Sequence, residues 1–311
     1  MRVLVALGGN AMTSADGSVG PDDQIAAAQT AMAAVAGLVA EGVDVVITHG
    51  NGPQVGNLLV KNELSAAVVP PVPLDWCGAQ TQGTLGFVLM NALEAALAQC
   101  GVRRPTAAVV TRTRVDSEDP GFRKPSKPIG RFLPKDEAQV LIEHGQYFED
   151  RGDKGWRRVV ASPEPREILD AGVVMTLADA GYLVVANGGG GIPVVRGDDG
   201  VLYGVEAVID KDLGAALLAR SVEADRLVIA TDVDHAIVGY GTDAAQPIGR
   251  VTVEQLRSYA ADGHFASGSM GPKVDAICRY VEQTGNTGVI TSLSNIVAGL
   301  RGESGTVVVA G

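Results

Sequence analysis

The feature that most constrains the fold is the regular alternation of short apolar runs with longer segments of helical spacing. Residues 2–7 form a near-continuous apolar run, which is typical of a strand buried on both faces. Residues 22–41 follow with apolar side chains at helical spacing and are closed by Gly42. Strands that alternate with helices pair in parallel through right-handed crossovers. The sequence therefore predicts an α/β protein with an open, mostly parallel, doubly wound sheet sandwiched by helices.

The length of 311 residues allows one large α/β unit or two lobes, and because the alternation extends along most of the chain we expect a single domain over residues 1–311. Strands are predicted at 2–7, 43–48, 106–111, 182–186, 226–231, 287–291 and 306–310. Helices are predicted at 22–41, after 53, and at 80–99, 165–179, 210–222, 252–261 and 273–284.

The alternation breaks between residues 116 and 160, a stretch with several prolines and glycines and dense charge. Residues 123–135 hold five basic side chains and no acidic one, although the whole chain has a net charge of −11. We interpret the stretch as an inserted, protruding lid subdomain that carries positive charge toward an anion. A solvated charged loop is the alternative.

Composition excludes several classes of function. A net charge of −11 argues against a nucleic-acid or anionic-membrane partner. Cys77, Cys100 and Cys278 have no C-x-x-C spacing and form no cluster with the four histidines, so neither a disulfide framework nor a metal held directly by the protein is expected. The chain has no signal-peptide pattern and no run of 18 apolar residues, so a cytoplasmic protein is expected.

Three glycine clusters follow predicted strands: Gly8-Gly9-Asn10, Gly50-Asn51-Gly52, and the four glycines at 188–191. Glycine at the carboxyl end of a parallel strand lets backbone N–H groups approach a phosphate, and a helix that begins there adds partial positive charge. We expect the three clusters to meet at one edge of the sheet and form an anion site. No P-loop or protein-kinase motif is present, and residues 50–56 have one residue too many for a dinucleotide fingerprint, so a nicotinamide enzyme is disfavoured.

Two lysines lie at predicted helix starts. Lys211 follows Asp210, and Lys273 follows Pro272. A cation at a helix N-terminus is electrostatically unfavourable unless an anion compensates it, and a bound phosphate is such an anion. Taken alone, each lysine is more often a surface residue than a phosphate ligand.

Seven segments, spread in order over essentially the whole chain, resemble carbamate kinase: residues 5–11, 49–56, 77–83, 125–130, 188–194, 206–212 and 268–273. The resemblance implies the amino-acid-kinase fold, a homodimer, and ATP or ADP with Mg²⁺ as cofactor. It also implies reversible phosphoryl transfer between ATP and carbamate, with ATP synthesis from carbamoyl phosphate as the expected direction in the cell. Breakdown of arginine, of purines or of oxamate remains open as the pathway.

The resemblance also implies roles for individual residues. Relatives that phosphorylate acetylglutamate or UMP carry a lysine two residues before the first glycine pair, where this chain has Ala6. We expect Lys127 of the inserted segment to replace that cation. The expected catalytic residues are Lys127, Lys211, Lys273 and Asp210, with Asp210 orienting the lysines. The expected substrate and phosphate ligands are Gly8, Gly9, Asn10, Gly50, Asn51, Gly52, Gly189 and Gly190. The expected nucleotide neighbours are Thr231, Asp232, Val233, Tyr240, Met270 and Pro272.

The same residues suit a reaction without a general base, because the oxygen of carbamate is already an anionic nucleophile. His49 is expected to be structural. Gly271 stands where the family often has a larger apolar residue, which predicts a looser nucleotide pocket. Two alternatives remain open: another small-molecule kinase of this fold, and a nucleotide-binding sensor of this fold that does not catalyse a reaction.

Overall fold

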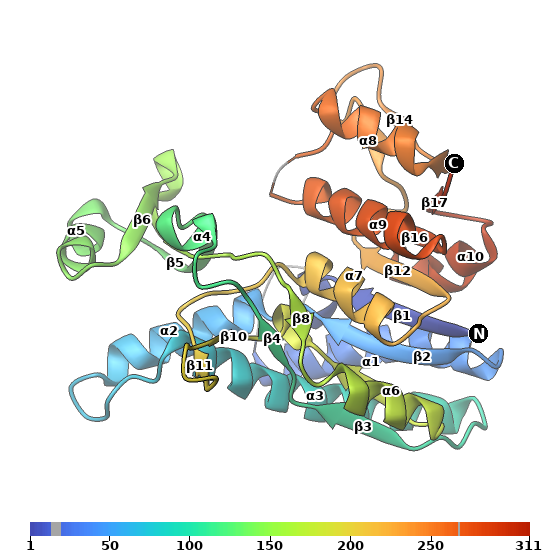
Figure 1. Ribbon diagram of the computed structural model, residues 1–311, viewed down its shortest axis with the longest axis horizontal. Coiled ribbons are helices and arrows are strands. Elements are labelled where there is room, and N and C mark those ends of the chain that lie inside the picture. The colour runs from blue at the N-terminus through green and yellow to red at the C-terminus, as the bar shows by residue number, and fades with distance from the viewer. Residues whose placement is uncertain (14–19, 267) are drawn as a thin grey trace.

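The computed structural model describes residues 1–13, 20–266 and 268–311, and an eight-stranded sheet forms its centre (Figure 1). Neighbouring strands are parallel except β16 and β17, which are antiparallel. The strand order across the sheet is β15 (Arg250–Thr252), β17 (Thr306–Val309), β16 (Thr287–Ser292), β12 (Arg226–Thr231), β1 (Arg2–Leu7), β2 (Asp44–His49), β9 (Leu183–Ala186) and β3 (Thr106–Val109). The expected open, mostly parallel sheet is confirmed.

Helices cover both faces of the sheet, which makes it doubly wound. Side chains of β1 alternate between the two faces: Val3 and Val5 belong to one buried cluster, whereas Leu4 and Ala6 belong to the other. The first cluster includes residues of α1 (Pro21–Ala40), α3 (Leu74–Gln99) and α10 (Ile296–Arg301). The second includes residues of α6 (Ala171–Asp179), α7 (Lys211–Ser221), α8 (Val253–Ala261) and α9 (Met270–Thr284). Burial of these apolar faces drives folding. It requires continuous apolar runs in the strands, which are buried on both faces, and a period of 3.6 residues in the helices.

The strand order brings the three glycine clusters to neighbouring positions. β12, β1, β2 and β9 are adjacent, and Leu7 at the end of β1 is in register with Ala230 on one side and His49 on the other. The turns after β1, β2 and β9 therefore share the carboxyl edge of the sheet, where open α/β sheets bind their ligands. The chain continues from these turns into the 3-10 helix η1 (Gly9–Met12), the helix α2 (Gly52–Ser65) and the 3-10 helix η3 (Gly188–Gly190).

Residues 116–160, the inserted segment, project from this body on the same side as α2, drawn in green in Figure 1. They form a three-stranded antiparallel sheet of β5, β7 and β6. Its elements are α4 (Pro120–Arg123), β5 (Lys127–Leu133), α5 (Lys135–Glu143), β6 (Tyr147–Asp150), the 3-10 helix η2 (Gly152–Lys154) and β7 (Trp156–Val160). Ile129 and Val160 pack against Val55 and Leu59 of α2, so this helix supports the inserted segment.

Two further small sheets lie outside the central sheet and the inserted segment. One contains β11 (Leu202–Gly204), β10 (Ile192–Arg196), β4 (Arg112–Arg114) and β8 (Glu167–Ile168), and the other pairs β13 (Ile237–Val238) with β14 (Gln246–Pro247). A further 3-10 helix, η4 (Leu293–Asn295), precedes α10. Within the residues described, no helix has the length and apolar character that a membrane span requires.

Candidate active site

A cavity of about 520 Å³ lies at the carboxyl edge of the sheet. Three parts of the molecule enclose it: the glycine turns after β1, β2 and β9, strand β5 of the inserted segment, and the first residues of α7 and α9. The predicted site residues among its lining are Gly8, Gly9, Gly50, Asn51, Gly52, Lys127, Gly189, Asp210, Lys211, Thr231, Asp232, Pro272 and Lys273.

The first two glycine turns pack so closely that side chains would obstruct them. The N–H of Gly50 donates to the carbonyl of Leu7 at 3.1 Å. A Cβ on Gly50 would lie 3.1 Å from Cδ of Lys211 and 3.2 Å from the backbone of Gly9. The floor of the cavity is thus bare backbone beside a lysine stem, a surface that suits the oxygens of a phosphoryl group.

His49 supports this floor from below. Its side chain is buried, its Nδ1 donates to the carbonyl of Gly50 at 2.9 Å, and its ring lies where a Cβ of Gly188 would be. Burial lowers the pKa of His49, which keeps the ring neutral. These contacts are those of a structural residue.

Lys127 reaches the cavity from the inserted segment. Its ammonium donates to Oδ2 of Asp210 at 2.7 Å. The other carboxylate oxygen of Asp210 accepts from the N–H groups of Asp212 and Leu213, so Asp210 is also the N-cap of α7. Burial alone would raise the pKa of Asp210, but the charge and hydrogen bond of Lys127 keep that pKa below its usual value.

Asp212 holds the other two lysines. It is 3% exposed, and its two oxygens accept from Lys211 at 2.7 Å and from Lys273 at 3.1 Å. The expectation that Asp210 orients all the lysines is therefore corrected: among the described residues Asp210 bonds Lys127, and Asp212 bonds Lys211 and Lys273. No role was predicted for Asp212, because adjacent residues of a helix, such as Lys211 and Asp212, do not normally face each other.

The five linked groups comprise three ammoniums and two carboxylates, so the cluster has one excess positive charge. Burial lowers the pKa of Lys211, and the nearby ammonium of Lys273 lowers it further, while Asp212 opposes both effects. A phosphate placed beside these lysines relieves their repulsion. The cluster is built to receive an anion.

Some predicted site residues do not reach the cavity. Tyr240 is 73% exposed on the loop between β13 and β14, and neither it nor Val233, Met270 or Gly190 is among the lining residues. The side chain of Asn10 lies outside the described part of the chain, although its backbone belongs to η1. Gly271 donates its N–H to Ala266, and a Cβ on Gly271 would lie 3.1 Å from that carbonyl oxygen.

Helix α3 supplies supporting residues that had no assigned role. Gln82 donates to the carbonyls of Thr111 and Gly188 and accepts from the N–H of Thr111. The segment 77–83 therefore braces the third glycine turn from inside the body. Buried polar groups that are fully paired in this way give a loop a single conformation.

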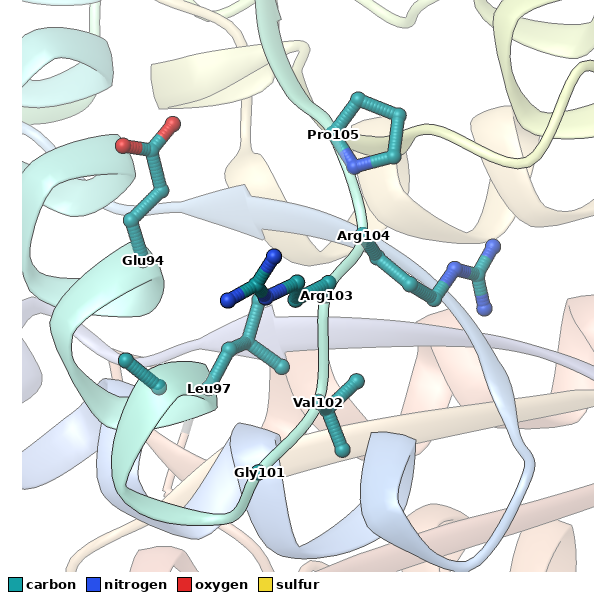
Figure 2. Close-up of a pocket in the computed structure, with 8 residues that line it drawn as sticks. Glu94, Leu97, Gly101, Val102, Arg103, Arg104 and Pro105 are labelled. Carbon is teal, nitrogen blue, oxygen red and sulfur yellow. The ribbon is translucent and has the colours of Figure 1, made fainter.

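A second hollow, of about 620 Å³, lies at the C-terminal end of α3 and the loop that leads into β3 (Figure 2). The loop enters β3 at the amino end of that strand, so this hollow lies at the amino edge of the parallel sheet, opposite the carboxyl edge that carries the glycine turns. Arg104 is already bound to Asp44 and to the carbonyl of Gly181, and Figure 2 shows Arg103 and Arg104 pointing away from each other. The lining does not converge on a ligand, so the chemistry is assigned to the first cavity.

Comparison with known proteins agrees with this geometry. The model of the amino acid kinase family matches residues 1–292. The chain is 44% identical to the carbamate kinase of Thermococcus kodakarensis and 42% identical to that of Trichomonas vaginalis, in each case over 99% of both chains. It also superposes on the solved structure of carbamate kinase from Giardia lamblia bound to AMP-PNP. That match has a TM-score of 0.94 and 39% identity, and covers 100% of this chain and 98% of the other.

Proposed function

The chain belongs to the amino acid kinase family, and we infer that it is a carbamate kinase, which transfers a phosphoryl group reversibly between ATP and carbamate. ADP and carbamoyl phosphate are the products of the forward reaction. The single observation that best supports this function is the cluster of three lysines and two aspartates beside the glycine turns.

The residues of the cluster suit the charge that develops during transfer. An oxygen of carbamate attacks the γ-phosphorus of ATP, and the bond from that phosphorus to the bridging oxygen breaks, so ADP leaves with the electron pair. Because negative charge spreads over the transferring group, catalysis consists mainly of positioning and positive charge. We assign the ammoniums of Lys127, Lys211 and Lys273 to that group and to the adjacent phosphates.

The two substrates are proposed to occupy opposite ends of the cavity. Thr231, Asp232 and Pro272 line the end formed by β12 and α9, and we assign the nucleotide to that end. Gly8, Gly9, Gly50, Asn51, Gly52 and Gly189 come from the turns after β1, β2 and β9, and we assign carbamate and the phosphoryl group to them.

We propose that Mg²⁺ enters with the nucleotide. The carboxylates of the cluster are committed to lysines, and the described residues contain no group of three His, Cys, Asp or Glu side chains that could hold a metal. This donor set fits an ion that keeps phosphate oxygens and water as its main ligands, as Mg²⁺ does in kinases. When bound, the ion neutralises charge on the β- and γ-phosphates.

We further propose that the inserted segment is a lid, because the cluster is complete only when Lys127 of β5 meets Asp210 at the start of α7. Closure would exclude water from carbamoyl phosphate, which hydrolyses readily. A homodimer in the cytoplasm, with no nucleic-acid or membrane partner, is proposed from the resemblance and from the net charge of −11.

A coupled assay of ATP formation from ADP, Mg²⁺ and carbamoyl phosphate tests the function. We expect turnover with carbamoyl phosphate and much slower turnover with acetyl phosphate, which has a methyl group in place of the amine. Equal rates with the two donors would contradict the carbamate assignment. Binding of ATP without turnover would instead favour a sensor.

A further inference from the structure

The side-chain amide of Asn51 has an unusual environment. Asn51 is the N-cap of α2, a position where asparagine normally bonds the first N–H groups of its helix, yet it makes no such bond. Its Nδ2 instead donates to Oγ1 of Thr81 in α3 at 2.9 Å. Asn51 also lines the cavity. The residue thus gives up a local stabilising bond in order to face the site.

Thr81 determines which way this amide faces. Oγ1 of Thr81 lies 2.7 Å from the carbonyl oxygen of Gly78, and two oxygens approach so closely only when a hydrogen lies between them. A carbonyl oxygen has no hydrogen, so the hydroxyl of Thr81 must supply it. Oγ1 can then only accept from Asn51, which places the nitrogen of the amide at Thr81 and leaves its oxygen on another side.

Gly189 confines the amide from a third direction. A Cβ on Gly189 would lie 2.2 Å from Nδ2, 2.4 Å from Cγ and 2.5 Å from Oδ1 of Asn51. The plane of the amide therefore lies flat against the third glycine turn. Among the hydrogen bonds of the described residues, Oδ1 of Asn51 has no partner, so it is an oriented and uncommitted acceptor beside the glycine floor.

The charged side chains in the rest of the cavity are three lysines and the carboxylates of Asp210, Asp212 and Asp232, of which Asp232 lies beside β12, where the nucleotide is assigned. The three lysines and the backbone N–H groups suit phosphate oxygens, and the carboxylates of Asp210 and Asp212 are already bonded to lysines. The amino group of carbamate needs an acceptor. On the basis of the function proposed above, we propose that Oδ1 of Asn51 accepts from that amino group and makes Asn51 a specificity-determining residue. Thr81 is the positioning residue that sets the orientation of the Asn51 amide.

The test compares carbamoyl phosphate with acetyl phosphate as phosphoryl donors to ADP. The measured quantity is the ratio of their kcat/KM values in the wild-type enzyme and in Thr81→Val, Thr81→Ser and Asn51→Ala. Valine cannot accept from Nδ2, so the amide is free to turn, and Thr81→Val should lower the ratio by at least roughly tenfold, the cost of about one unpaired buried group. Thr81→Ser keeps the hydroxyl, so its ratio of kcat/KM values should be close to that of the wild-type enzyme.

Thr84→Val is the matched control, because it makes the same change at an exposed position of α3. It should leave the ratio unchanged. Asn51→Ala should lower kcat/KM for carbamoyl phosphate much more than for acetyl phosphate. The KM for ADP should move little in any of these variants.

Two results would overturn the inference while the proposed function stands: a wild-type ratio in Thr81→Val, or an equal loss with both donors in Asn51→Ala. An equal loss with both donors in Asn51→Ala would mean that Asn51 contacts the acyl phosphate group, which the two donors share. A wild-type enzyme that makes no ATP from carbamoyl phosphate would instead refute the proposed function, and the inference with it.

Discussion

Lys127 and Asp210 are 83 positions apart in the sequence, yet the ammonium of one lies 2.7 Å from the carboxylate of the other. The bond joins the inserted segment to the first turn of α7, next to Lys211. One carboxylate thereby begins a helix and receives a cation from a different part of the molecule.

Lys211→Ala and Lys273→Ala should each lower kcat by roughly 10²–10³, which is typical of the loss of one preorganised donor to the transition state. The melting temperature should hardly change, because each variant leaves Asp212 bonded to the remaining lysine. Steady-state kinetics and thermal unfolding check the two effects. A large fall in melting temperature with near-normal kcat would show that these lysines are structural.

Asp212→Asn should destabilise the protein as well as slow it. Asparagine removes the charge that compensates Lys211 and Lys273, whose side chains are 22% and 12% exposed. The free energy of unfolding should fall by about 3 kcal/mol at neutral pH, the usual cost of leaving a buried charge without its partner. Urea unfolding measures this loss, which should shrink at alkaline pH as Lys211, whose pKa is lowered by burial, loses its proton. Asp243→Asn, at an exposed position, is the control and should be neutral.

The pH dependence of kcat/KM should report the state of Lys211. Burial and the neighbouring Lys273 lower the pKa of Lys211, so its ammonium persists below that pKa and is lost as the pH rises through it. Activity should therefore fall on the alkaline side, at a pH below the usual pKa of lysine. In Lys211→Arg the alkaline fall in kcat/KM should occur at higher pH, because a guanidinium keeps its charge. The activity of this variant should be lower than that of the wild type. If the alkaline fall in kcat/KM stayed at the same pH in Lys211→Arg, the titrating group would be a residue other than Lys211.

Gly189→Ala should impair the site through a collision with Asn51. The added Cβ would lie 2.2 Å from Nδ2 of Asn51, at a residue whose φ is +68°. We expect kcat/KM for carbamoyl phosphate to fall by more than about tenfold, since a displaced positioning group costs at least that much. Gly200→Ala separates collision from backbone strain, because Gly200 has a φ of +79° and nothing within 4 Å of its Cβ position. Equal kinetic losses in the two variants would remove Asn51 from the explanation.

Most of the sheet could be predicted from the sequence, because parallel strands that are buried on both faces have uninterrupted apolar sequences. β1 (Arg2–Leu7) and β12 (Arg226–Thr231) have the expected bounds. Helix α3 begins at Leu74 rather than at residue 80, since Gly78 is a poor helix former that obscured its first turns. Neither the β10–β11 hairpin nor α10 was expected, because each is short and its pattern is weak.

Individual roles in the site were harder to predict than its location. The glycine turns, Lys211 and Lys273 could be recognised because glycine after a strand and lysine at a helix start both indicate an anion. Lys127 was expected from the resemblance and from the basic run at 123–135. The part played by Asp212 depends on Lys273, which is 61 positions away, and no local pattern reveals that pairing. Tyr240, expected from the resemblance among the nucleotide neighbours, is exposed on the loop between β13 and β14, and its role stays a prediction.

The most direct test of the account is the kcat of Lys127→Ala beside Lys124→Ala and Lys135→Ala. If Lys127 contacts the transferring phosphoryl group, its removal should reduce kcat by on the order of 10²–10³, whereas the affinity for ADP should change little. The two control lysines belong to the same basic segment and are exposed, so their removal should have only mild effects that weaken further with salt. A Lys127→Ala enzyme with near wild-type kcat, or three variants with similar mild defects, would contradict a cation delivered by the inserted segment.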